Sequence, residues 1–404
     1  MKILFITSTN SDNLEDGLLH GFRNIFGADC VDFPKKEMMY DNFSAVSADQ
    51  CYGRLFTLWR TLPDIPVNRT DIEQRVKRGD FDLIIMGSIH RVQPWYKTLL
   101  PYLTKRNTII IDGEDRNALL RHAALRFLYF KRELTPKTGS YFLGRIIPAA
   151  LYSRIRLYPS HVQPISFCFP KEKITAGITP NHKTSLFQSH IVDQEIKDSP
   201  MFRQNTHISD KYIFDTEQEY YRDLQQARFG ITTKRGGWDC LRHYEIAANG
   251  AVQCFRDYSQ KPISCAPDGL QHGVNMIEYH NAEDLAEKIN SLSDADYESL
   301  LHHSYTWIHN QTTEKRASSK GRILSAKRLL LNLTAALFIA TPLARADFKV
   351  PPLSGPVNDH AGLLAPEVKG RLNTFLSNLW QQGGSQIAVL TVEDLGGIPI
   401  EQAS

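Results

Sequence analysis

The chain has 404 residues, of which 42% are hydrophobic and 23% are charged. These values are ordinary for a globular protein and exclude a largely disordered chain, a fibrous chain and a polytopic membrane protein. The net charge is +3, from 47 basic and 44 acidic residues, so no nucleic-acid partner is expected. The 6 cysteines lack paired metal-ligand spacing. They indicate neither a zinc site nor a disulfide framework and fit buried thiols in the cytoplasm.

The first part of the chain alternates apolar runs with amphipathic segments. Three continuous apolar runs predict strands, at Lys2–Thr7, Phe81–Gly87 and Thr108–Asp112. Apolar residues at helical spacing predict helices over Leu14–Phe26 and Arg116–Lys131. Apolar strands joined by helices are typical of a parallel sheet that is covered on both faces. We therefore expect a Rossmann-like domain over residues 1–165.

The same alternation resumes after residue 164. The predicted strands lie at His182–His190, Arg228–Thr232, Ala251–Phe255 and Gly273–Tyr279, and the predicted helices at Glu217–Gln226, Trp238–Asn249 and Ala282–Leu292. This pattern predicts a second Rossmann-like domain over residues 166–315. The fold class is then α/β, with two such domains facing a cleft. The polar run Asn310–Lys320 resembles a linker, which we place at residues 316–326.

The predicted strands of the first domain end in polar side chains. These are Ser8 and Asn10, then His90, then Asp112, Glu114 and Asp115. The carboxyl ends of parallel strands meet at one edge of a sheet, where open α/β folds bind ligands, so we expect these residues to line the cleft. Two of them have structural alternatives, because Asp115 could be the N-cap of the following helix and His90 an ordinary loop residue.

The stretch Ile231–Phe255 joins a predicted strand to a predicted helix through a basic loop with two glycines. Lys234 and Arg235 lie beside the N–H groups at the start of that helix, where an anion such as a diphosphate is favoured. Helical spacing puts an apolar stripe opposite a polar one that carries Trp238, Arg242, Glu245 and Asn249. We expect Arg242 and Glu245 to point outward; the alternative is a solvated face with an ordinary Arg–Glu pair.

The run from Lys234 to Phe255 resembles the donor-binding half of GT-B glycosyltransferases, in particular the CgeB-like and exostosin-like groups of bacterial polysaccharide and spore-coat gene clusters. The resemblance implies a nucleotide-sugar donor, with its ribose on Glu245 and its diphosphate on basic residues. The donor-binding residues that it implies are Lys234, Arg235, Gly236, Gly237, Trp238, Asp239, Arg242, Glu245 and Asn249. Gly237 departs from the related pattern that has an acidic residue eight positions before Glu245, which argues against a retaining mechanism of that type.

The resemblance also assigns the first domain to the acceptor. Its strand ends then supply Ser8, Asn10 and Asp112 to the acceptor side of the cleft. An inverting transfer needs a general base for the acceptor hydroxyl, so the candidate catalytic residues are Asp115, His90 and Glu114.

No metal and no cofactor are expected. The triplet Asp294-Ala295-Asp296 matches the metal motif of the other major glycosyltransferase fold, but its place after Ser293 favours a helix cap. His302 and His303 have no partner at ligand spacing. We therefore expect metal-independent chemistry, with the nucleotide-sugar as substrate.

The last part of the chain has a different character. Residues 327–346 match a secretory signal peptide: a basic flank, the apolar stretch Leu329–Leu343 and an A-x-A ending. Residues 347–404 resemble the opening of a TPM domain from exported, YgcG-like proteins, through Val350–Leu353, Asp359 and Gly362–Leu364. We expect a truncated α/β appendage that arose by fusion. The alternatives are that Leu329–Leu343 contacts a membrane or packs as a helix on the enzyme.

The sequence as a whole predicts a cytoplasmic glycosyltransferase, with membrane association as the alternative, that moves a sugar from a nucleotide-sugar donor to a glycan, a cell-surface polysaccharide or a lipid-linked acceptor. Two alternatives stay open. One is a non-catalytic nucleotide- or glycan-binding protein of the same fold. The other is an exported or membrane-associated protein whose function resides in the TPM-like segment.

Overall fold

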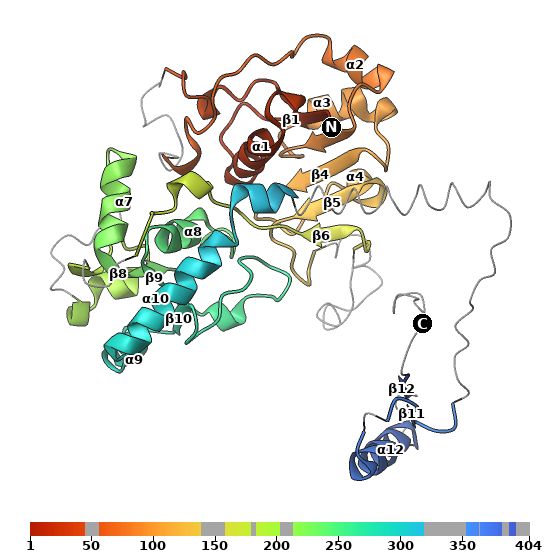
Figure 1. Ribbon diagram of the computed structural model, residues 1–404, viewed down its shortest axis with the longest axis vertical. Helices are drawn as coiled ribbons and strands as arrows, with labels where there is room; N and C mark the ends of the chain where they lie inside the picture. Colours follow the sequence, from red (N-terminus) through yellow and green to blue (C-terminus); the bar gives the residue numbers. More distant parts are fainter. Residues whose placement is uncertain are drawn as a thin grey trace. The chain divides into compact units, whose positions relative to one another are not determined.

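The computed structural model describes residues 1–44, 56–138, 158–178, 183–202, 213–318, 353–362, 364–381 and 388–392. The chain divides into two compact units, Met1–Leu331 and Asn332–Ser404. The first unit contains two lobes, each built on one parallel sheet, and Figure 1 labels its main elements from β1 to α10.

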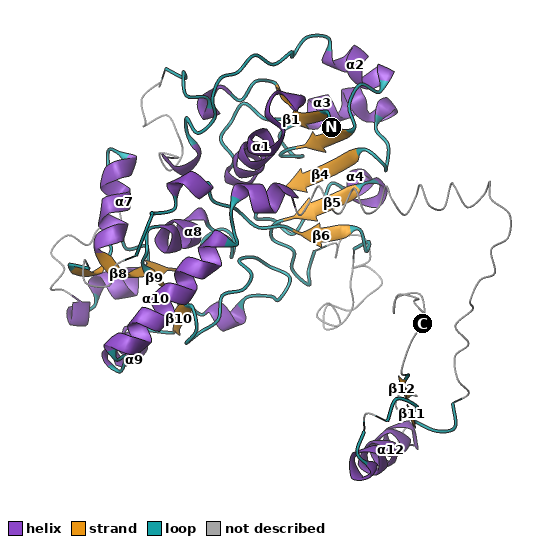
Figure 2. Ribbon diagram, in the orientation of Figure 1, coloured by secondary structure: helices purple, strands orange, loops and turns teal. Residues whose placement is uncertain are grey.

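The N-terminal lobe is built on a six-stranded sheet. Its strands are β1 (Ile3–Ile6), β2 (Cys30–Phe33), β3 (Leu83–Met86), β4 (Thr108–Asp112), β5 (Leu128–Lys131) and β6 (Val162–Pro164). The strand order is β2-β1-β3-β4-β5-β6, and every neighbouring pair is parallel, as the aligned arrows in Figure 2 suggest. All six carboxyl ends therefore lie at the same edge of the sheet.

Helices cover both faces of this sheet, because alternate strand residues point to opposite sides. Ile3 and Phe5 of β1 share a buried cluster with α1 (Asn13–Phe26). Leu4 and Ile6 belong to a second cluster with α2 (Ile72–Arg78), α3 (Gln93–Leu99) and α4 (Arg121–Arg126). Short 3₁₀ turns complete the lobe: η1 (Gly27–Asp29), η2 (Glu37–Met39), η5 (Phe56–Leu58) and η6 (Leu100–Tyr102).

The C-terminal lobe is built on a four-stranded parallel sheet in the order β10-β9-β8-β7. Its strands are β7 (Ser185–Phe187), β8 (Ala227–Thr232), β9 (Val252–Arg256) and β10 (Met276–Tyr279). Its helices are α6 (Gln194–Asp198), α7 (Glu217–Gln226), α8 (Leu241–Ala248), α9 (Ala282–Asn290) and α10 (Asp294–His309), with turns η8 (Lys171–Lys173), η10 (Pro200–Phe202) and η11 (Tyr258–Gln260). Side chains of α7 and α8 share a buried cluster with those of α1, so one apolar core joins the two lobes.

The predicted α/β class with two Rossmann-like lobes is confirmed, but one predicted helix is wrong. The segment Arg116–Lys131 contains only the short helix α4, and its end forms strand β5. All four residues of β5 are buried between β4 and β6, so sheet pairing outweighs the helical spacing of the apolar residues. Helix α8 begins at Leu241 rather than near Trp238.

The polar run expected to be a linker instead packs on the N-terminal lobe over its described part. Residues 313–318 are helical, and Ala317 is fully buried. Thr313 N–H donates to the carbonyl of Phe169, and Phe169 N–H donates to the carbonyl of Gln311, both at 3.0 Å. Gly21 of α1 is required here, because a Cβ would collide with the backbone carbonyl of Thr313. The two chain connections between the lobes thus run side by side against α1.

The second unit contains a small parallel pair of strands with one helix. Strands β11 (Val357–Asp359) and β12 (Val389–Thr391) pair directly, and α12 (Pro366–Gln381) connects them along the chain. This agrees with the partial α/β appendage expected there. The predicted signal-like segment 327–346 lies outside the described residues. Among the residues that are described, no helix has the length and apolar composition needed to span a membrane.

Candidate functional site

The carboxyl ends of the two sheets meet through polar contacts. Arg132, just after β5, donates from Nη1 to the carbonyl of Asp239 at 2.7 Å. Its neighbour Glu133 accepts the Asp239 N–H at 3.0 Å. Both residues are almost fully buried, so the loop that precedes α8 is fixed against the N-terminal lobe. The two lobes therefore present their ligand-binding edges to each other, as the sequence predicted.

The loop after β8 carries the predicted phosphate-binding cations. Lys234, Arg235 and Gly236 are exposed, and Nζ of Lys234 lies 5.5 Å from the centre of the Trp238 ring. Within the described part of the chain, neither the Lys234 nor the Arg235 side chain forms an ion pair. Their positive charges are therefore available to an anionic ligand.

A cleft of about 710 Å³ opens beside this loop at the carboxyl edge of the second sheet. Its walls are formed by Val192, Asp193, Gln194, Glu195, Thr233, Lys234, Arg235, Trp238, Arg256, Asp257 and Gln260. Part of the acidic wall is neutralised, because Arg256 donates to Asp193 at 3.0 Å and to Glu195 at 2.6 Å. The cleft therefore combines two cations that have no carboxylate partner with a wall of fixed polar groups. This combination suits a phosphorylated ligand that also carries hydroxyl groups.

The glycines of the loop lie in close contact with the N-terminal lobe. A Cβ on Gly237 would collide with the carboxylate of Glu133, and one on Gly236 would collide with the carboxylate of Asp115. The absence of a side chain at position 237 thus has a direct cause, because Glu133 occupies the space that such a side chain would need.

Asp239 does not reach the cleft as predicted. It is 3% exposed and accepts hydrogen bonds from the Phe167 N–H at 2.7 Å and from the Tyr244 hydroxyl at 2.8 Å. Burial raises the pKa of Asp239 to about 6, against the opposing charge of Arg132. Asp239 therefore joins the lobes and is not among the residues that line the cleft, and its assignment to donor binding stays a prediction.

Glu245 does not point outward into solvent. Its Oε1 accepts the Thr57 hydroxyl and its Oε2 accepts the Tyr220 hydroxyl, both at 2.6 Å. Burial raises the pKa of Glu245, while these two hydrogen bonds and the charge of Arg242 act in the opposite direction. Arg242 is half-buried on the same helix. Glu245 thus lies between the lobes, where each of its oxygens already accepts a hydrogen bond from a protein hydroxyl group.

Asn249 is placed away from the other predicted donor residues. It caps the far end of α8, where its side chain donates to the Glu245 carbonyl at 3.0 Å and accepts from Gln225 at 3.0 Å. That end of α8 precedes β9 and lies at the amino edge of the sheet. Asn249 is therefore placed apart from the cleft beside Lys234 and Arg235, and its assignment to donor binding stays a prediction.

On the N-terminal side, Asp112 organises a cluster at the end of β4. It is fully buried, and its Oδ2 accepts from the Tyr129 hydroxyl and lies 3.1 Å from His90 Nε2. Its Oδ1 accepts from Lys131 Nζ at 3.0 Å and from the Glu114 N–H at 3.1 Å. Burial alone would raise the pKa of Asp112, but the His90 hydrogen bond and the Lys131 charge outweigh it, so the pKa is lowered.

The remaining predicted residues of this lobe differ in how far their side chains are exposed to solvent. The His90 side chain is 22% exposed and is the part of the cluster that a ligand can contact. Asp112 and Ser8 are buried against protein groups, and their assignment to acceptor contact stays a prediction. Asn10 is exposed, and its carbonyl accepts from Lys36. Asp115 is ion-paired with Arg132 and does not cap a helix, since α4 has Leu120 at its N-cap.

Sequence reasoning missed several residues of the site. Arg132 and Glu133 follow a strand that was taken for a helix, so no strand-end signal pointed to them. Arg256, Asp257 and Gln260 follow β9, a predicted strand, and the rule that ligands bind at carboxyl ends could have found them. Thr57 had no local signal.

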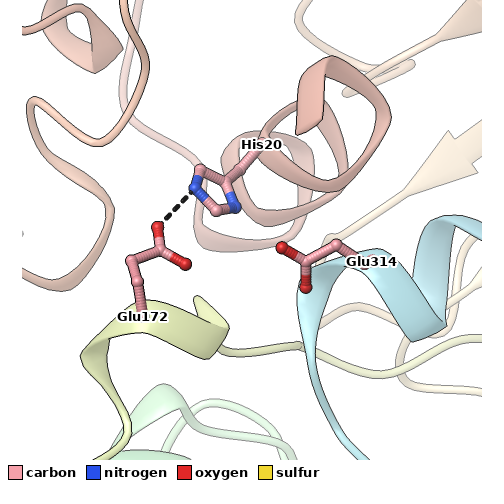
Figure 3. A group of neighbouring side chains, drawn as sticks. All are labelled: His20, Glu172 and Glu314. Atoms are coloured by element: carbon pink, nitrogen blue, oxygen red, sulfur yellow. Dashed lines mark ion pairs between the residues drawn. The ribbon is translucent and has the colours of Figure 1, made fainter. Parts of the chain in front are cut away.

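One group of described residues has metal-ligating atoms close together, but it forms a hydrogen-bonded chain. His20, Glu172 and Glu314 place ligand atoms within 4.8 Å of one another. Figure 3 shows that Glu172 faces one ring nitrogen of His20 while Glu314 lies on the other side of the ring. His20 Nε2 is 2.8 Å from Glu172, and its Nδ1 is 2.9 Å from the Thr313 hydroxyl. The group links α1 to both chain connections. Asp294 and Asp296 lie in the first turn of α10, where Ser293 and Asp296 form the predicted cap.

Comparison with known proteins gives one family match and several distant structural similarities. Residues 357–404 match the TPM domain family. No curated protein matches the chain in sequence. Among solved structures, HepE of Anabaena in complex with UDP has 11% identity and a TM-score of 0.48, over 81% of this chain and 100% of that chain. A glycosyltransferase from Rickettsia africae has 12% identity and a TM-score of 0.47, over 80% of this chain and 98% of that chain. Sucrose-phosphate synthase of Thermosynechococcus elongatus has 12% identity and a TM-score of 0.41, over 83% of this chain and 100% of that chain. These scores describe a distant similarity in the arrangement of elements, so the roles proposed below rest on the residues of this chain.

Proposed function

We propose that the unit Met1–Leu331 is a glycosyltransferase that moves a sugar from a nucleotide-sugar donor to a hydroxyl-bearing acceptor. One observation carries the proposal: Lys234 and Arg235, without carboxylate partners, lie at the carboxyl end of β8 beside a cleft large enough for a nucleotide-sugar. The N-terminal lobe carries a histidine, His90, held by the buried carboxylate of Asp112 at the carboxyl edge of its own sheet. A cationic site for a diphosphate and a basic group for a hydroxyl suit displacement of a diphosphate by a hydroxyl group.

In this proposal the cations act on the leaving group. When the bond between the anomeric carbon and the diphosphate breaks, negative charge grows on the diphosphate oxygens. Lys234 and Arg235 stabilise that charge from fixed positions at the edge of the sheet.

His90 is the best-placed general base of the three candidates. Asp115 is neutralised by Arg132, and the Glu114 carboxylate lies 3.7 Å from Arg116. Asp112 faces Nε2 of His90, which leaves Nδ1 to take the acceptor proton while the acceptor oxygen attacks the anomeric carbon. Asp112 then stabilises the imidazolium that forms. A single displacement of this kind inverts the anomeric configuration.

A non-catalytic nucleotide-binding protein is the second candidate. The buried Arg132–Asp239 contact favours it, because it fixes the two lobes to each other. The TPM match over residues 357–404 supports a separate role for the C-terminal unit, and its export or membrane contact remains an expectation from the sequence.

Binding and turnover by the full chain test the proposal. Calorimetry with uridine, guanosine and adenosine diphosphates should detect one of them, and Lys234→Gln with Arg235→Gln should weaken it at least tenfold. The matching nucleotide-sugar should be hydrolysed slowly or transferred. His90→Gln should reduce turnover about 100-fold or more with the nucleotide affinity unchanged. Nucleotide binding without turnover of any sugar donor would favour the binding protein instead.

A further inference from the structure

Asp257 has an unusual backbone conformation at the edge of the cleft. It directly follows β9, and its φ is +53°, a left-handed value that residues other than glycine adopt at a cost. The residue lines the same cleft as Lys234 and Arg235. Glycine would adopt this conformation without strain. An aspartate at this position therefore indicates that its side chain makes an interaction that glycine could not make.

The contacts of Asp257 leave one carboxylate oxygen lightly engaged. Its Oδ1 is 2.8 Å from His280 Nδ1, a contact near the surface because the His280 side chain is 55% exposed. Its Oδ2 is 3.8 Å from Arg256 Nε, beyond hydrogen-bond distance. Arg256 itself donates hydrogen bonds to Asp193 and Glu195. The Asp257 carboxylate is therefore a fixed anion that retains capacity to accept hydrogen bonds in the cleft.

We propose that Asp257 is a specificity-determining residue that accepts hydrogen bonds from hydroxyl groups of a sugar ring of the bound ligand. The inference rests on the proposed function and adds a second anchor to it. Lys234 and Arg235 attract the phosphates, whereas the Asp257 carboxylate repels them and can bind only the hydroxyl-bearing part. The division of charge within one cleft thus orients the ligand along it.

A purely structural role for Asp257 predicts different behaviour. In that case Asp257 would act only through its contact with His280, and an exposed ion pair of this kind contributes little to stability. Glycine at position 257 would then be neutral or favourable, since it adopts a positive φ freely. Substitutions at position 257 can therefore separate the two roles, because stability reports the backbone strain and ligand affinity reports the binding role.

The experiment uses the full chain with two variants and one matched control. Asp257→Asn keeps the shape and tolerance for the left-handed conformation but removes the charge. Asp257→Gly relieves the backbone and removes the side chain. Asp71→Gly is the control, because Asp71 also has a positive φ, of +51°, at the start of α2, where its side chain makes no capping hydrogen bond. Calorimetry measures binding of inorganic pyrophosphate and of the nucleoside diphosphate and nucleotide-sugar that the wild type binds.

We expect both Asp257 variants to lose tenfold or more in affinity for the nucleoside diphosphate, the nucleotide-sugar or both, with pyrophosphate affinity unchanged or increased. Asp257→Gly should keep or raise the Tm, and Asp71→Gly should leave all affinities unchanged. Unchanged affinities in both Asp257 variants would overturn the assignment alone. A wild type that binds none of these ligands would overturn the proposed function and this inference with it.

Discussion

The hydroxyl of Thr57 donates to the Oε1 of Glu245 at 2.6 Å and thereby joins η5 of the N-terminal lobe to α8 of the C-terminal lobe. Tyr220 occupies the other carboxylate oxygen at the same distance. Each carboxylate oxygen already accepts one hydrogen bond, so a ribose hydroxyl would compete with these partners for Glu245 or exchange with one of them. Tyr220 lies on the same lobe as Glu245, so Thr57 is the partner that a separation of the lobes would remove.

Thr57→Val tests this exchange, because valine keeps the shape and removes the competing hydroxyl. We expect the affinity for the nucleoside diphosphate to rise about threefold to tenfold, the equivalent of one hydrogen bond. Tyr221→Phe is the control, since Tyr221 contacts the Thr57 hydroxyl at 2.8 Å and not Glu245. A fall in affinity in Thr57→Val, measured by calorimetry, would mean that Thr57 orients Glu245 for the ligand instead of competing with it.

Glu245 itself should affect both binding and stability. Glu245→Ala leaves the Thr57 and Tyr220 hydroxyls without their acceptor, so we expect the free energy of unfolding to fall by about 1–3 kcal/mol. Glu245→Gln keeps an acceptor and should cost less stability, yet still weaken nucleotide binding about tenfold. Urea unfolding and calorimetry on both variants separate the two effects. Unaltered nucleotide binding in both variants would show that Glu245 only holds the lobes together.

Asp112 should make stability depend on pH in a defined direction. Its pKa is lowered in the folded state, so its contribution is present above the unfolded pKa of about 4 and is lost as the pH falls through the folded pKa. We expect Asp112→Asn to be less stable than the wild type by about 3–5 kcal/mol at pH 7, because Lys131 loses its buried partner. In urea unfolding at pH 7, 5 and 3, the difference in unfolding free energy between the wild type and Asp112→Asn should narrow only at the acidic end of this range. A gap that stays constant over this range would contradict the assigned charge state.

Gly237 should tolerate no larger residue. In Gly237→Ala the new methyl group displaces Glu133, which is 2% exposed and held by Arg132 and the Asp239 N–H, so we expect a loss of about 1–3 kcal/mol in unfolding free energy. Gly177→Ala is the matched control, because a Cβ there meets no atom within 4 Å. Equal stability of the two variants in urea unfolding would show that the lobes are not tightly packed at this point.

The sequence predicted most of the regular elements because their signals are local. Strand β4 and helix α7 have the bounds predicted for them, since a short apolar run and a capped amphipathic segment each carry their own information. Strand β5 was missed because Leu128–Lys131 continues the apolar spacing of α4, and only pairing with β4 and β6 makes it a strand.

For the candidate site, the sequence predicted where Lys234 and Arg235 lie at the end of a strand, but it did not predict the contacts that Glu245 and Asp112 make with distant segments. Lys234 and Arg235 lie where the strand-end rule placed them. Glu245 looked exposed from the helix pattern, because Thr57, which covers it, is far away in the sequence and has no recognisable motif. Asp112 was predicted at the edge of the cleft, but its partners His90, Tyr129 and Lys131 come from three other segments and bury it.

The most direct test of the account is transfer or hydrolysis of nucleotide-sugars by the full chain. A panel of uridine, guanosine and adenosine diphosphate sugars is incubated with the wild type and with the Lys234→Gln, Arg235→Gln double variant, and the released nucleoside diphosphate is measured. The account predicts release from at least one donor by the wild type, reduced at least tenfold in the double variant. No release from any donor, or release that the double variant leaves unchanged, would contradict it.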